Sequence, residues 1–321
     1  MRILVTRKLA QNVVEKLKAQ YEWDLDIWDF DEPIPRDELL QRVRGVNGIL
    51  CLLTDKIDAE VLDAAGDSLR IISTMSVGYD HIDIEECKKR SIRVGFTPDV
   101  LTDSVADLAM ALMLNAGRRI KEASEAAKNG QWTYWRPYWM TGYDLTGSTV
   151  GIVGFGRIGK AIAKRLVGFN CKIKYYDVRR DEQAEHELGV EYAELEEVLL
   201  TSDFVTLHVA PTKETTNMIN KDTLSKMKNT AVLINTSRGS LVNTEDLADA
   251  LSQKQIFAAA LDTVNPEPLP SEHRLYSMSN CLIVPHIASA TTETRNKMGL
   301  LAADNLVTGL NNQPMPKEIN I

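Results

Sequence analysis

The stretch "STVGIVGFGRIGKAIAKRL", residues 148 to 166, decides the fold of this chain. An apolar run typical of a buried β-strand leads into glycines at positions 154, 156 and 159, and residues with helical apolar spacing follow. In such a unit Gly154 makes a tight turn, Gly156 lets the backbone approach a phosphate, and Gly159 lets helix and strand pack closely. The helix N-terminus offers N–H groups and a positive dipole end to that phosphate. This context favours a dinucleotide site over a structural turn.

The next predicted strand, "KIKYYD", ends in Asp177, 18 residues after Gly159. A carboxylate here can accept hydrogen bonds from ribose hydroxyls and repels a 2′-phosphate, so Asp177 favours NAD(H). Arg179 and Arg180 favour the opposite choice, because guanidinium groups pair with the 2′-phosphate of NADP(H). The two arginines can equally belong to a solvated turn. The residues therefore predict NADH or NADPH as cofactor, with NADH favoured.

Short apolar runs rich in Val and Ile recur along the chain, beginning at residues 2, 48, 70, 149, 172, 203, 231, 258 and 281. Most intervals leave room for a helix, so the pattern predicts an α/β fold of parallel sheets covered on both faces. Two sets of these signals meet around residues 100 to 150, and 321 residues are enough for two domains. The apolar stretch at 105 to 117 contains Asp107 and is too short for a membrane span, which indicates a buried helix.

Composition argues against several functional classes. A net charge of -8 and a pI near 5.3 argue against a nucleic-acid or anionic-membrane surface. The four cysteines are scattered without zinc-ligand spacing, so we expect no metal site and free thiols in a reducing compartment such as the cytoplasm. The N-terminus reaches a charged residue at once and is typical of a first strand and helix rather than a signal peptide.

Polar residues follow three later predicted strands: Arg238, then Asp262 with Glu267, then His286. Ligands of open parallel sheets lie outside these carboxyl ends. Hydride transfer to a 2-oxo acid needs a cation for the carboxylate, a proton donor, and a carboxylate that keeps the donor protonated, and Arg238, His286 and Glu267 fit these roles. Alone, each has a simpler interpretation as a carbonyl cap, a core histidine or a solvated acid. Their joint placement favours catalysis.

Two further features have alternative interpretations. His208 ends a predicted strand and is a candidate to line the cofactor cleft. The aromatic segment 131–146 contains three of the chain's five tryptophans. It is either a surface loop packed on its own domain or an arm buried against another subunit, and its aromatic density favours the arm.

Several motifs in this order resemble those of the D-isomer-specific 2-hydroxyacid dehydrogenases, and within that family the glyoxylate/hydroxypyruvate reductases. They are "STMSVGYDHIDIEECKKRSIRVGFTPDVLTDSVADLAMALML", "VGIVGFGRIGKAIAKRL", "LINTSRGSLVN", "AAALDTVNPEPLP" and "LIVPHIASATTETRNKM". The resemblance spans almost the whole chain.

The resemblance implies a smaller flavodoxin-like α/β substrate domain, 1–103 and 288–321, with a Rossmann-type dinucleotide-binding domain, 104–287, inserted into it. It implies NAD(P)H-dependent reduction of hydroxypyruvate to D-glycerate and of glyoxylate to glycolate. It further implies a homodimer whose aromatic arm, 131–146, brings Trp135 into the neighbouring subunit's site.

The resemblance also assigns roles to individual residues. Arg238 would bind the substrate carboxylate and carbonyl, Glu267 would support the acid/base, and His286 would donate the proton. Val77, Gly78 and Ser289 would contact the substrate. The expected cofactor contacts, together with the glycines, are Thr102, Arg157, Ile158, Asp177, Ser237 and Asp262.

Two alternatives stay open. The chain could be another D-2-hydroxyacid dehydrogenase, of the phosphoglycerate or 2-ketogluconate type. It could also be an NAD(H)-sensing scaffold similar to the C-terminal-binding corepressors, which keep the same three residues.

Overall fold

The computed structural model describes residues 1–20 and 23–320. Contacts divide the chain into two compact units, which we call unit 1 (Met1–Leu101 and Ala290–Ile321) and unit 2 (Thr102–Ser289). The boundaries expected from the sequence, 103 and 287, lie beside the observed ones, 101 and 289. Within the described residues, no helix combines the length and the apolar character that crossing a membrane would require.

Unit 1 is built on a five-stranded parallel sheet of order β2-β1-β3-β4-β5, the strand order of flavodoxin-like folds. Its strands are β1 (Arg2–Val5), β2 (Asp24–Ile27), β3 (Gly48–Cys51), β4 (Ile71–Thr74) and β5 (Arg93–Gly95). Its helices are α1 (Gln11–Lys18), α2 (Arg36–Arg42), α3 (Ala59–Ala65), α4 (Ile84–Lys89) and α13 (Thr292–Leu310).

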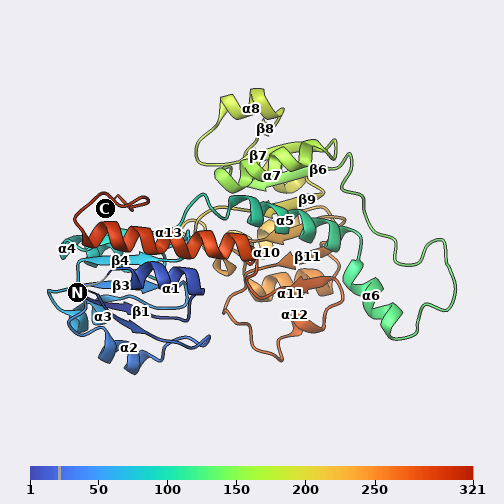
Figure 1. Cartoon of the computed structure of the whole chain (residues 1–321). Helices are drawn as coiled ribbons and strands as arrows, with labels where there is room; N and C mark the ends of the chain where they lie inside the picture. The colour runs from blue at the N-terminus through green and yellow to red at the C-terminus, as the bar shows by residue number, and fades with distance from the viewer. Residues whose placement is uncertain (21–22, 321) are drawn as a thin grey trace. The chain divides into compact units, whose positions relative to one another are not determined.

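Helices cover both faces of this sheet, which is why the central strands are buried throughout. All four residues of β3 and of β4 are buried. The long helix α13, red in Figure 1, packs on α1 and on β3 and β4, and the Ser73 hydroxyl donates to the Ala302 carbonyl at 2.7 Å. Segments from both ends of the chain therefore complete one unit.

Unit 2 contains a seven-stranded parallel sheet of order β12-β11-β10-β9-β6-β7-β8. Its strands are β6 (Thr149–Val153), β7 (Lys172–Tyr176), β8 (Glu191–Tyr192), β9 (Phe204–Leu207), β10 (Val232–Asn235), β11 (Ala258–Leu261) and β12 (Cys281–Ile283). The order reverses between β6 and β9. In open parallel sheets, ligands bind outside the carboxyl ends of the strands at such a reversal, so we expect the ligand at this point.

The helices of unit 2 are α5 (Thr102–Gly117), α6 (Ile120–Lys128), α7 (Arg157–Val167), α8 (Glu182–Leu188), α9 (Leu195–Thr201), α10 (Lys221–Lys226), α11 (Thr244–Ser252) and α12 (Arg274–Ser277), with a short 3-10 turn η1 (Gly239–Leu241). The expected buried helix is α5, which packs on α7, β10 and β11. Two cores lie on the two faces of the sheet, one around Phe204 and Met113 and one around Leu207 and Leu233.

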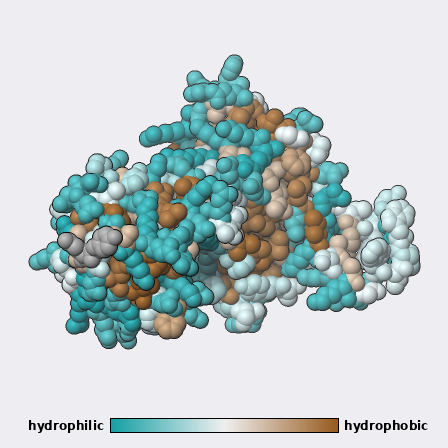
Figure 2. Space-filling view, viewed as in Figure 1, coloured by the Kyte–Doolittle hydropathy of each residue, from teal (hydrophilic) through white to brown (hydrophobic). Residues whose placement is uncertain are grey.

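The segment 131–146 between α6 and β6 has no helix or strand and extends away from the sheet of unit 2 (Figure 1). The same segment is pale in Figure 2, because tryptophan and tyrosine lie near the middle of the hydropathy scale. Five of its aromatic side chains are exposed: Trp132, Tyr134, Trp135, Tyr138 and Tyr143.

The predicted α/β fold class is confirmed, and the nine apolar runs all form strands. Three strands were not predicted, namely β2, β5 and β8.

Candidate active site

The glycine-rich loop joins β6 to α7 and requires glycine at its two ends. Gly154 has a φ of +97°, and a Cβ there would lie 2.5 Å from the His208 backbone. A Cβ on Gly159 would overlap the Gly154 carbonyl oxygen. Gly156, by contrast, faces open space, and no side chain caps the N-terminus of α7, where Arg157 and Ile158 begin the helix. The loop thus leaves backbone room beside a helix N-terminus, as a pyrophosphate requires.

Asp177 follows β7 and lies against the glycine-rich loop. Its Oδ2 accepts from the Phe155 N–H at 2.7 Å and its Oδ1 from the Arg179 N–H at 3.1 Å. These bonds hold the carboxylate where dinucleotide-binding folds place an acid against the ribose. Of the two arginines that follow, Arg180 is paired with Glu185 at 2.8 Å, and Arg179 is exposed. The residues present fit a nicotinamide dinucleotide.

His208 and Ser237 follow β9 and β10 at the same edge of the sheet. The Nε2 of His208 lies 2.7 Å from the Thr206 hydroxyl, and burial lowers the pKa of His208 to about 3, so its ring is neutral. The Ser237 hydroxyl donates to the Val209 carbonyl at 2.6 Å and so ties the two strand ends together. Thr102, also expected to contact the cofactor, is the first residue of α5.

The central feature of the site is a histidine–carboxylate pair. The Nδ1 of His286 lies 2.6 Å from the Glu267 Oε1 (His286 side chain 24% exposed). An ionised carboxylate only accepts, so Nδ1 carries the proton of this bond. No described residue bonds to Nε2. Nε2 is therefore the ring nitrogen of His286 that the fold leaves for a ligand.

Asp262 fixes the turn that presents His286. Its Oδ1 and Oδ2 accept from the N–H groups of Ile287, at 2.6 Å, and Ala288, at 3.0 Å, and its own carbonyl accepts from the His286 N–H at 3.0 Å. Burial raises the pKa of Asp262. His286 has a φ of +52°, an uncommon conformation for a residue with a side chain, which these bonds stabilise. Both oxygens of this carboxylate are thus engaged by the backbone of the turn.

Arg238 lies on the loop after β10, which packs directly on the loop that carries Glu267. Its carbonyl accepts from the Asn235 side chain at 2.8 Å, and its Nη1 donates to the Ser237 carbonyl at 3.0 Å. A Cβ on the next residue, Gly239, would overlap the Val264 carbonyl. This glycine lets the Arg238 and Glu267 loops lie in contact.

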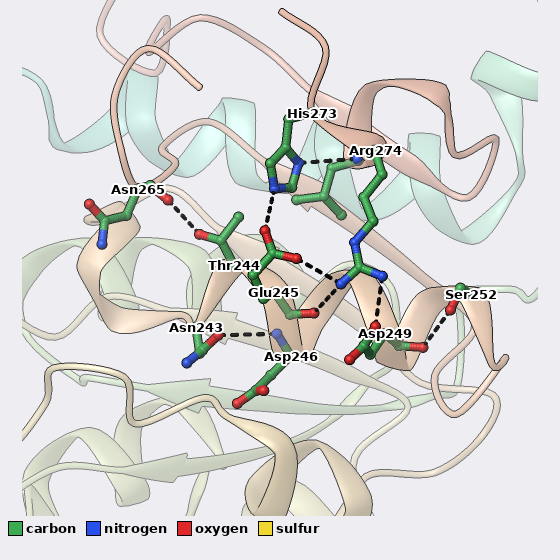
Figure 3. A network of polar contacts seen from close by, with 10 residues as sticks. Asn243, Thr244, Glu245, Asp246, Asp249, Ser252, Asn265, His273 and Arg274 are labelled. Carbon is green, nitrogen blue, oxygen red and sulfur yellow. Dashed lines mark hydrogen bonds and ion pairs between the residues drawn. The ribbon is translucent and has the colours of Figure 1, made fainter. Parts of the chain in front are cut away.

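The first turn of α11 is hydrogen-bonded to the loop that carries Glu267, and Figure 3 shows the contacts of Thr244 and Glu245. The Thr244 hydroxyl donates to the Asn265 carbonyl at 2.6 Å, two residues before Glu267. The next residue, Glu245, lies 2.9 Å from His273 and 2.8 Å from Arg274 at the far end of the loop. Thr244 was not predicted from the sequence, and its position after the helix-capping Asn243 is the only signal that marks it.

The expected substrate contacts lie in different units. Val77 and Gly78 belong to unit 1 and follow β4, where the Ser76 hydroxyl donates to the Gly78 carbonyl at 2.6 Å. Ser289 is the last residue of unit 2 and is buried. Trp135 lies on the arm and is 80% exposed.

A cavity of about 670 Å³ opens at the other end of the unit 2 sheet, beside the amino ends of β11 and β12. Its polar lining is largely paired within the fold: Lys121 donates to the Cys281 carbonyl at 2.8 Å, and Asn280 to the Phe257 carbonyl at 3.1 Å. Ligands of parallel sheets bind at carboxyl ends, so the His286 edge is the candidate active site, and this cavity is not.

The glycine-rich loop, Asp177 and the strand order define unit 2 as a Rossmann-type dinucleotide-binding domain. The profile of the D-isomer specific 2-hydroxyacid dehydrogenase NAD-binding domain matches residues 110–288. Glyoxylate reductase/hydroxypyruvate reductase of Homo sapiens is 50% identical over 323 residues, covering 100% of this chain and 98% of that protein. Glyoxylate reductase of Thermofilum pendens is 50% identical over 292 residues, 90% of this chain and 86% of that protein.

A solved structure from Thermus thermophilus has a TM-score of 0.93 and 41% identity, with 100% of both chains covered. The chain belongs to the D-isomer-specific 2-hydroxyacid dehydrogenases, as its motifs indicated. It is therefore an oxidoreductase that uses a nicotinamide cofactor.

Proposed function

We propose that this protein reduces small 2-oxo acids, with hydroxypyruvate and glyoxylate as its main substrates. The observation that carries the proposal is the 2.6 Å pair between His286 and Glu267 on a dinucleotide-binding sheet. The relatives named for glyoxylate and hydroxypyruvate reduction support this choice of acids.

In the proposed mechanism, the glycine-rich loop and Asp177 would hold a reduced nicotinamide cofactor, which would be the source of the hydride for the carbonyl carbon. His286 donates the proton on Nε2 to the carbonyl oxygen, which becomes the hydroxyl of the product. Glu267 stabilises the imidazolium before transfer and keeps the ring oriented through Nδ1. Arg238 binds the substrate carboxylate, with the N–H groups of Val77 and Gly78 and the hydroxyl of Ser289 as further donors.

We propose NADH as the preferred cofactor. The Asp177 carboxylate, fixed by two backbone N–H groups, is suited to accept from ribose hydroxyls and would repel a 2′-phosphate. Arg157, Ile158, Ser237 and His208 are the proposed neighbours of the phosphates and the nicotinamide ribose.

The exposed aromatic arm supports a homodimer as the working form. Trp132, Tyr134, Trp135 and Tyr138 are 66%, 65%, 80% and 87% exposed, which is unusual for such large apolar surfaces on one segment. In the proposed dimer the arm packs on a second copy and Trp135 borders that copy's substrate site. We place the enzyme in the cytoplasm, where its cysteines would stay reduced.

A substrate panel tests the proposal. Purified protein is mixed with NADH or NADPH and with glyoxylate, hydroxypyruvate, phosphohydroxypyruvate or 2-ketogluconate, and cofactor oxidation is followed by the loss of dihydronicotinamide absorbance. We expect the fastest turnover with NADH and hydroxypyruvate or glyoxylate. Preference for either of the other acids would assign the chain to another branch of the family. NADH binding without turnover of any acid would favour a scaffold role.

A further inference from the structure

The turn after β7, close in sequence to Asp177, contains an arginine that is paired with a glutamate of α8. Arg180 leaves this turn three residues after Asp177, where a guanidinium is well suited to pair with a 2′-phosphate. Its Nε and Nη2 instead both donate to Glu185 of α8, at 2.8 Å each. The guanidinium also lies over the Tyr192 ring, 5.9 Å from its centroid.

Glu185 is itself anchored to the core. The hydroxyl of Tyr175 donates to Glu185 Oε1 at 2.7 Å, and Tyr175 is fully buried. The Tyr175 ring stacks on Phe155, at a centroid distance of 4.0 Å, and Phe155 N–H holds Asp177. Only 16% of the Glu185 side chain is exposed. Glu185 is therefore a fixed acceptor beside the glycine-rich loop rather than a mobile surface acid.

The other charges of this turn are mostly paired as well. Lys160 of α7 forms an ion pair with Asp181, whose carboxylate also accepts from the Ala184 N–H at 3.0 Å. A 2′-phosphate placed beside Asp177 would meet acids on the turn and on α8, and Arg180 would first have to leave Glu185 before it could pair with that phosphate.

We propose that Glu185 is a specificity-determining residue for the cofactor. It holds the Arg180 guanidinium through two hydrogen bonds and thereby prevents it from pairing with the 2′-phosphate of NADPH. This inference rests on the proposed cofactor site. Asp177 repels the phosphate directly, whereas Glu185 acts indirectly, because it holds Arg180.

The test measures binding of 5′-ADP and 2′,5′-ADP by isothermal titration calorimetry, which needs no turnover. In Glu185→Gln the amide oxygen still accepts from Tyr175, but the ionic hold on Arg180 is lost. We expect the affinity for 2′,5′-ADP to rise about threefold to tenfold, with that for 5′-ADP unchanged within about twofold. NADPH and NADH affinities, followed by protein fluorescence, should change in the same ratio.

Two controls separate this effect from a general loss of negative charge. Glu187→Gln removes the same charge from the same helix, where Glu187 contacts only Gln183 among the described residues, and should leave the ratio unchanged. The double variant Glu185→Gln/Arg180→Met should lose the gain. An equal gain in Glu187→Gln, or a gain that survives removal of Arg180, would overturn the proposal.

Arg180→Met alone tests the proposal even if Glu185→Gln fails to fold. Because Arg180 is already held in the wild type, its removal should change 2′,5′-ADP affinity by less than about twofold. A tenfold loss would show that Arg180 reaches the phosphate despite Glu185. If the wild type binds neither 5′-ADP nor 2′,5′-ADP, the result contradicts the proposed cofactor site itself, whereas an unchanged affinity ratio in Glu185→Gln contradicts only the role of Glu185.

Discussion

His286 and His273 both lie in unit 2, and both contact a glutamate, Glu267 at 2.6 Å and Glu245 at 2.9 Å. They differ in their second ring nitrogen. His273 Nδ1 accepts from the Leu275 N–H at 3.2 Å and caps α12, so its other nitrogen, Nε2, donates to Glu245 (Figure 3). His286 uses Nδ1 for Glu267 and keeps Nε2 for another partner.

The comparison teaches that a histidine–carboxylate pair does not by itself indicate acid–base chemistry. In His273 both nitrogens are occupied by the fold, and protonation of Nδ1 would break the helix cap. In His286 the carboxylate fixes the ring and the remaining nitrogen can exchange a proton with a ligand. The two histidines also differ in their surroundings, because His286 lies at the carboxyl end of the sheet, beside the loops that carry Glu267 and Arg238.

The largest expected effect separates the two histidines directly. His286→Asn removes the proposed proton donor, so kcat/KM for hydroxypyruvate should fall about 100- to 1000-fold, measured by NADH oxidation. His273→Asn is the matched control, because asparagine also caps helices, and its activity should stay within about threefold of wild type. Activity of His286→Asn within tenfold of wild type would remove the histidine from the mechanism.

Glu267 and Glu245, the partners of the two histidines, allow the same comparison. Glu267→Gln keeps a hydrogen-bond acceptor for Nδ1 but cannot stabilise an imidazolium by charge. We expect kcat to fall about tenfold to 100-fold, because the neutral amide cannot stabilise the positive charge of the proton donor.

Glu245→Gln is the control for this prediction, since it changes the same charge at the other pair. It should leave kcat unchanged. A Glu267→Gln kcat that matches the wild type would mean that the carboxylate only positions the ring.

A third histidine adds a pH effect on stability. Burial lowers the pKa of His208 to about 3, so below pH of about 6.5 the unfolded chain binds a proton that the folded unit 2 does not. Acidification therefore favours unfolding, by at most about 2 kcal/mol between pH 7 and pH 5.

Urea unfolding at the two pH values measures this loss, and His208→Gln should lack it. The exposed His186 serves as the control, because His186→Gln should keep the wild-type difference. Equal pH dependence in His208→Gln and wild type would show that His208 is solvated enough to take up its proton.

Much of the fold was predictable because buried parallel strands need continuous apolar runs. The three strands that were missed, β2, β5 and β8, are all at sheet edges. In β2, "DLDI", no residue is fully buried, and β8 has only two residues. An edge strand is covered less and is often shorter, so its sequence carries less of the apolar signal.

The candidate site also has a part that the sequence predicted and a part that it did not. The glycines and the strand-end residues could be predicted, because their roles follow from local backbone geometry. The pairing of His273 with Glu245, and of Arg180 with Glu185, was not, because side-chain partners depend on how a helix lies over a neighbouring loop. Asp262 illustrates the same limit: its place after β11 was predictable, but its bonds to the backbone of Ile287 and Ala288 depend on the turn after β12.

The smallest expected effect concerns Thr244, which links the two pairs. Its hydroxyl holds the Asn265 carbonyl of the Glu267 loop at 2.6 Å, while the adjacent Glu245 holds His273. Thr244→Val keeps the shape and removes one hydrogen bond, so the Glu267 loop should move and kcat should fall about threefold to tenfold with KM for NADH unchanged.

Thr244→Ser should restore kcat, because it returns the hydroxyl and omits only a methyl group. Ser252→Ala, at the other end of α11, removes a hydroxyl that bonds to the Asp249 carbonyl at 2.9 Å and should leave kcat unchanged. If Thr244→Val lowers the melting temperature but leaves kcat unchanged, the threonine stabilises the loop without positioning Glu267. A lower kcat that Thr244→Ser rescues would instead extend the catalytic arrangement from the His286–Glu267 pair to the first turn of α11.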